Sequence, residues 1–145
     1  MSEHGIGAVK VGMTLAEASS VAMGTLTAPP AADTAECGFA TWKGGPAGVR
    51  FMTARGRIAR VDVSSGVVAT AAGARVGDAE EKIAALYPGR VQVGPSKYSS
   101  GHTLTIKGGS PADSMYRLIF DTDGKRVTAL RAGRSPEVAF VEGCG

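Results

Sequence analysis

The amino-acid sequence predicts an α+β fold of two tandem units, each a short helical segment packed on an antiparallel sheet of three to four strands. A helix-start motif occurs twice, apolar residues alternate after each helix, and turn residues separate the alternating segments. We expect a disordered N-terminus at residues 1–5, a first repeat unit at 6–66 and a second at 67–145. With 145 residues, the two units would form one compact domain in total.

The helix-start motif consists of a base, a valine and a glycine, followed by a capping-box spacing. Its two copies are Lys10–Glu17 and Arg75–Glu81. In a capping box the first side chain accepts from a backbone N–H three residues on, and a Glu at that position reaches back. The pairs with this spacing are Thr14 with Glu17 and Asp78 with Glu81, so we expect helices over about 15–23 and 79–87.

Strands are expected where apolar and polar residues alternate. In the first unit these segments are 39–43, 48–53 and 57–63; in the second they are 90–93, 102–107, 115–120, 125–132 and 138–141. Ala54-Arg55-Gly56 and Asp121-Thr122-Asp123-Gly124 provide hairpin turn signals. One helix cannot cover both faces of such a sheet, so we expect one face to stay open.

The two cysteines, Cys37 and Cys144, predict a disulfide. Neither has a Cys or His nearby at metal-ligand spacing, and a bond would hold a C-terminal tail that otherwise frays. The alternative is two unrelated free thiols. Because disulfides persist mainly outside the cytoplasm, we expect an extracytoplasmic protein, periplasmic or secreted, whose signal segment is not part of this sequence.

Several functional classes lack their signatures. The net charge of +3 is spread over both units, so no basic stretch predicts nucleic-acid binding. No run of 18 apolar residues predicts a transmembrane segment. We expect no cofactor, because the glycine pairs lack the context of a nucleotide loop. We also expect no metal: Asp121 could start a calcium loop, but position twelve of that loop is Ala132 rather than a Glu.

Two aromatic residues stand beside lysine and glycine rather than in an alternating pattern. Trp42 with Lys43, and Tyr98 with Lys97, are therefore possible partner-binding residues, since exposed aromatics commonly anchor interfaces. Partial packing in the core is the alternative. Ser100 and His102 suggest a remote hydrolase alternative, which would also need an orienting acid and an oxyanion site.

The pattern Val11-Gly12-Met13-Thr14-Leu15-Ala16-Glu17, followed by a short helix, a glycine and antiparallel strands, resembles the beta-lactamase-inhibitory-protein-like group. It also resembles the small outer-membrane assembly lipoproteins of the BamE/SmpA type. The resemblance implies two helix-onto-sheet units that present a sheet to a protein. The long loop at Pro29-Pro30 departs from a compact inhibitor, and no inhibitor contact residue carries over.

These observations predict a non-enzymatic binding module, inhibitor-like or otherwise protein-binding, whose partner is a protein or an envelope component. A structural envelope protein without a discrete target is the alternative. The same scaffold would also suit a secreted bacterial protein of unknown function.

Overall fold

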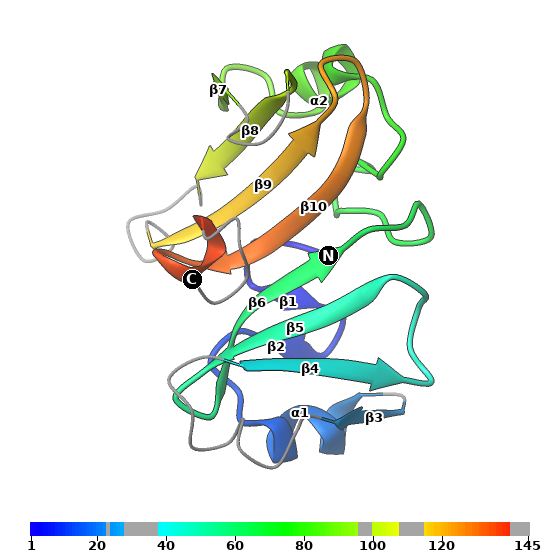
Figure 1. Ribbon diagram of the computed structural model, residues 1–145, viewed down its shortest axis with the longest axis vertical. Coiled ribbons are helices and arrows are strands. Elements are labelled where there is room, and N and C mark those ends of the chain that lie inside the picture. The colour runs from blue at the N-terminus through cyan, green and yellow to red at the C-terminus, as the bar shows by residue number, and fades with distance from the viewer. Residues whose placement is uncertain (23, 28–37, 96–99, 108–114, 140–145) are drawn as a thin grey trace.

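The computed structural model describes residues 1–22, 24–27, 38–95, 100–107 and 115–139, and it shows a mostly β protein (Figure 1). Eight strands form one antiparallel sheet in the order β3-β4-β5-β6-β10-β9-β8-β7. In that order the strands are β3 (Thr25–Thr27), β4 (Gly38–Lys43), β5 (Val49–Ala54), β6 (Arg57–Val63), β10 (Val127–Arg134), β9 (Tyr116–Thr122), β8 (His102–Lys107) and β7 (Val91–Pro95).

The predicted α+β fold of two tandem helix-on-sheet units is wrong. Strand β6 pairs directly with β10, with Val61 opposite Ala132, so one sheet runs through both proposed units. Within the described ranges the α-helices are α1 (Leu15–Val21) and α2 (Glu80–Leu86), of seven residues each. If β6 and β10 ended two separate sheets, each would leave a row of unpaired backbone N–H and C=O groups at its edge. Pairing β6 with β10 satisfies both rows.

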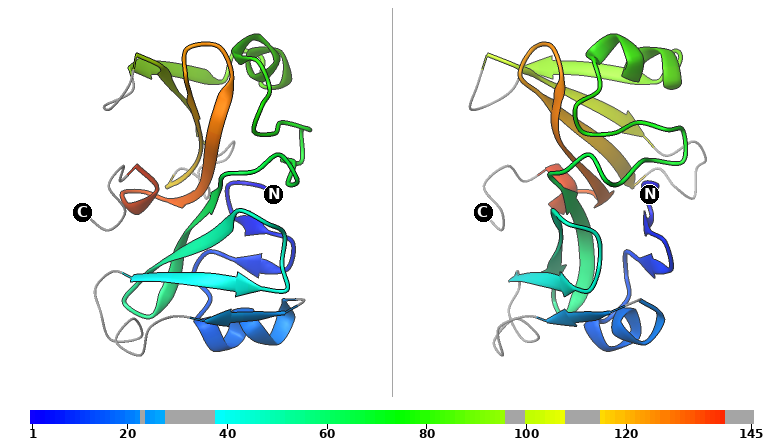
Figure 2. Two further views of the ribbon diagram at one scale, coloured as in Figure 1. Left: turned by 45° about the vertical axis from the view of Figure 1, so that its right-hand side comes forward. Right: turned by 90° about the vertical axis from the view of Figure 1, so that its right-hand side faces the viewer.

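One face of the sheet carries the core. Phe51, Val61, Phe120 and Leu130 project from the strands into a single buried cluster, which also includes Ile83 of α2. The cluster is completed by α1 and by the small sheet of β1 (Gly5–Ile6) and β2 (Val9–Lys10). Figure 2 shows α1, β1 and β2 on this side of the large sheet. We call it the core face.

The opposite side, here the open face, carries the alternate residues of the same strands. Met52 and Ile119 are buried there but do not belong to the core cluster. The 3-10 helix η3 (Glu137–Ala139) packs against β6, β9 and β10 and buries Val138. The strand expected at 138–141 is therefore wrong where the structure describes it, and residues 140 and 141 lie outside the described part.

The cap of the first predicted capping box is confirmed, because the Glu17 amide donates to Thr14 Oγ1 at 3.1 Å. The Glu17 carboxylate accepts from the Thr14 hydroxyl, also at 3.1 Å, and not from the backbone amide that the box predicts. The second is wrong. The N-cap of α2 is Ala79, which has no side chain to accept a hydrogen bond. Asp78 Oδ2 accepts instead from the backbone amide of Arg75 at 2.8 Å, closing the turn before the helix.

The two motif glycines nevertheless have similar surroundings. The Gly12 amide donates to Ile58 O at 2.7 Å, and the Gly77 amide donates to Val127 O at 2.8 Å. Their φ angles are 98° and 97°, a region that favours glycine. The repeated sequence thus marks two similar connections from loop to helix, although the helices lie on one shared sheet.

Candidate binding site

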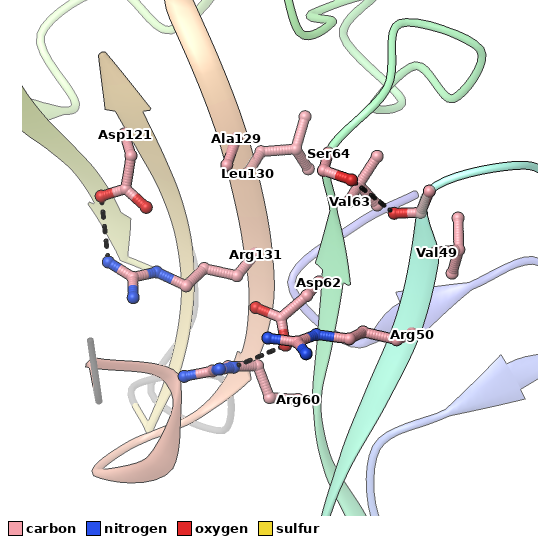
Figure 3. A pocket seen from close by; sticks show the side chains of 11 residues that line it. Val49, Arg50, Arg60, Asp62, Val63, Ser64, Asp121, Ala129, Leu130 and Arg131 are labelled. Carbon is pink, nitrogen blue, oxygen red and sulfur yellow. Dashed lines mark hydrogen bonds and ion pairs between the residues drawn. The ribbon is translucent and has the colours of Figure 1, made fainter. Parts of the chain in front are cut away.

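A row of charged residues crosses the middle of the open face. Asp62 on β6 lies opposite Arg50 on β5 and opposite Arg131 on β10. Directly opposed side chains in an antiparallel sheet have Cβ atoms about 5 Å apart. The register therefore places one carboxylate between two guanidinium groups, on three adjacent strands (Figure 3).

Two ion pairs with buried arginines hold this cluster together. Arg60 Nε lies 3.1 Å from Asp62 Oδ2, and Arg131 Nη2 lies 3.1 Å from Asp121 Oδ1. The arginine side chains are only 3% and 7% exposed. Arg60 Nη1 also donates to the carbonyl of Glu137 at 3.0 Å, which ties η3 to the sheet. Arg60 is thus held by β6 and η3, and Arg131 by Asp121 of β9.

Arg50 differs from these two arginines. It is exposed, and its guanidinium carbon lies 4.2 Å from the centre of the Phe39 ring. A guanidinium over an aromatic face at this distance is a cation–π contact. Within the part of the chain that the structure describes, no carboxylate forms an ion pair with Arg50. In the cluster of Arg50, Arg60, Asp62, Asp121 and Arg131, Arg50 is therefore the arginine without an ion pair to a described carboxylate.

The cluster lines a depression of about 510 Å³, which we call the arginine notch. Burial raises the pKa of Asp121, and nearby Arg131 opposes that rise. Burial also lowers the pKa of Arg60, whereas the contact with Asp62 raises it. For both groups burial therefore disfavours the charged form, and the ion-pair partner favours it.

Trp42, one of the two aromatic residues that the sequence predicted to bind a partner, does not lie on the face of the arginine notch. Trp42 is half-buried on the core face, 5.8 Å from Phe51 between ring centres. It lines an apolar depression of about 550 Å³ together with Val21 and Pro46. Lys43, the next residue, is exposed, and alternation along β4 directs it to the open face. The structure thus separates Trp42 from Lys43.

The other sequence-predicted residues of a binding site or disulfide lie outside the described part of the chain. These are Lys97, Tyr98, Cys37 and Cys144.

His102 has an acidic partner on the helix. Its Nδ1 lies 2.8 Å from Glu80 Oε2, and Thr122 Oγ1 donates to the same oxygen at 2.6 Å. This acid is one part of the hydrolase alternative. In the described ranges no hydrogen bond joins Ser100 to His102, so the nucleophile–base contact of that mechanism is not formed. The Glu80 network instead connects the start of α2 to β8 and β9.

The described residues do not form two other kinds of site. No group of three or more His, Cys, Asp or Glu side chains is arranged to hold a metal ion within the described ranges. Nor does any helix there have the length and apolar character needed to cross a membrane.

Sequence reasoning missed the arginine notch. The signal was present in the alternation of β6, where Arg60 and Asp62 occupy one face and Val61 and Val63 the other. Charged residues at successive same-face positions of an apolar strand indicate a charged sheet face. The arginines of β5 and β10 could not be added to it, because the sequence did not show that these strands flank β6.

Comparisons with family models, with curated proteins and with solved structures found no match for this chain.

Proposed function

We propose that this chain is a non-enzymatic binding module that holds a protein partner against the open face of its sheet. The observation that carries the proposal is the arginine notch, with exposed Arg50 beside the ion pairs of buried Arg60 and Arg131. An exposed arginine without an ion pair to a described carboxylate favours an acidic partner surface, since complementary potentials guide association and exclude other partners.

Stability alone gives a poor reason for these charges. Burying an ion pair costs several kcal/mol per ion in desolvation, and apolar residues of similar size are often equally stabilising. Arg60 and Arg131 are nevertheless charged groups buried at the centre of the sheet. A role of these charges in recognition accounts for their position.

The proposed module works outside the cytoplasm. This part of the proposal rests on a Cys37–Cys144 disulfide, for which the intact mass before and after reduction is the test. The resemblance to the beta-lactamase-inhibitory-protein-like group supports a protein partner. Tyr98 stays a predicted contact, whereas Trp42 lies on the core face, away from this surface. A structural envelope protein is the competing function, and it requires no discrete partner.

Partner capture with matched variants tests the proposal. The full chain, purified without reductant, is immobilised and exposed to an envelope extract, alongside Arg50→Ala and Lys10→Ala. Both variants lose one positive charge from an exposed position, but Lys10 belongs to β2 on the core side. We expect one protein retained by the wild type and by Lys10→Ala, with at least tenfold less retained by Arg50→Ala, as for a charged interface anchor.

Equal retention by all three proteins would place the contact elsewhere. No retained protein at low or physiological salt would favour the structural alternative.

A further inference from the structure

We propose that the arginine notch is a carboxylate-binding subsite, filled in the complex by one aspartate or glutamate side chain of the partner. This inference rests on the proposed function and names the chemistry of its central contact. It begins from the fact that both carboxylates of the cluster already have a partner: Asp62 binds Arg60, and Asp121 binds Arg131. Arg50 has no such anion among the described residues.

Arg50 is positioned to bind a planar carboxylate. The Phe39 ring supports one side of the guanidinium, which restricts the side chain before a partner arrives. A guanidinium fork can then donate two parallel hydrogen bonds to the two carboxylate oxygens. Because the fork is held in advance, less conformational entropy is lost on binding.

The neighbouring charges limit which anion fits. Asp62 lies opposite Arg50 in the register, and both Asp62 and Asp121 line the same depression. Arg50 neutralises a monoanion, whereas a dianion bound to Arg50 would leave a net negative charge beside these two carboxylates, so a phosphate dianion fits less well. One exposed arginine is also too little for a nucleic-acid backbone, which needs many cations in a row. A single carboxylate supplies the partner that Arg50 lacks among the described residues.

The position of the notch favours a side chain of a protein over a free small molecule. The notch opens on the face of an eight-stranded sheet, between β5, β6 and β10, rather than in a closed cavity. A free carboxylate there would keep part of its hydration and bind more weakly than the same group in a covered interface. A partner that covers the sheet would exclude this water and strengthen the ion pair.

The test uses the full chain and N-acetyl-aspartate N-methylamide, a probe that carries one carboxylate. Arginine Nε–Hε resonances are followed by NMR as the probe is added at constant ionic strength. We expect a saturable shift of the Arg50 and Arg131 signals in the wild type and in Lys10→Gln. In Arg50→Gln the response of the Arg131 signal should weaken at least tenfold. The neutral N-acetyl-asparagine N-methylamide should shift neither signal.

Three results would overturn the subsite: equal shifts with the asparagine probe, an unchanged Arg131 response in Arg50→Gln, or equal shifts of all exposed arginines. Tighter, Arg50-dependent binding of inorganic phosphate would overturn it too, by assigning the notch to a free anion.

The subsite and the proposed function can fail separately. If the probe does not bind but partner capture still depends on Arg50, the carboxylate subsite is wrong and the binding face stands. If the probe binds as expected but no protein is captured, the subsite stands as an anion site and the protein-binding function is wrong.

Discussion

At the scale of single residues, Glu80 joins three elements by polar contacts away from the arginine notch. Its carboxylate accepts from Thr122 Oγ1 at 2.6 Å and lies 2.8 Å from His102 Nδ1. The hydrogen bond from Thr122, with a further contribution from His102, lowers the pKa of Glu80 from its ordinary value of 4.5, and burial opposes the change. The ionised form is therefore the one that the folded protein favours.

Replacing Glu80 should weaken the fold in a pH-dependent way. A carboxyl whose pKa is lowered on folding stabilises the protein above its unfolded pKa, and this stabilisation disappears as the pH falls through the folded value. We expect Glu80→Gln to lower the free energy of unfolding by about 1–3 kcal/mol at pH 7, with a smaller loss in acid. Urea unfolding between neutral and acidic pH measures both quantities. Glu81→Gln, at an exposed position of the same helix, is the control. Equal effects of the two substitutions at every pH would contradict this role.

Local patterns were predicted at this scale, and distant contacts were not. The Thr14 cap was predictable because its partner Glu17 is three residues away. The contact of His102 with Glu80 spans 22 residues of sequence, and no spacing rule connects them. The second cap failed although its spacing was correct, because Asp78 satisfies a turn rather than the helix.

At the scale of elements, the individual strands were far easier to predict than their partners. The segments 57–63 and 102–107 match β6 and β8, since alternation is a property of the strand itself. Alternation carries no information about which edges meet, so the pairing of β6 with β10 was missed. Because β6 pairs with β10, the protein has one large sheet where two separate sheets were predicted.

A glycine in β10 allows this central pairing, and its replacement tests it. Gly133 lies opposite Arg60 of β6, and a Cβ added there would clash with the backbone oxygen of Ala59. We expect Gly133→Ala to destabilise the protein by about 1–3 kcal/mol, the usual cost of overpacking. Gly94→Ala is a matched control on edge strand β7, where the nearest atom, Thr103 O, is 3.9 Å from the added Cβ. Chemical denaturation of both variants checks the difference, and equal stabilities would argue against close packing of β6 on β10.

At the scale of the whole molecule, the two faces of the large sheet differ in what they carry. One face buries the apolar cluster under α1, α2 and the β1–β2 sheet. The other carries the arginine notch beside η3. Two residues of β4 report on the two faces separately: Phe39 lies under Arg50 on the open face, whereas Trp42 packs against the core. Both side chains are half-buried, so a probe of solvent access can reach each of them.

Hydroxyl-radical labelling of the full chain, alone and with its captured partner, therefore tests the binding face most directly. The account predicts that labelling of Phe39 falls in the complex while labelling of Trp42 is unchanged, because the partner covers only the open face. Protection of Trp42 with no change at Phe39 would contradict the account and place the partner on the core side.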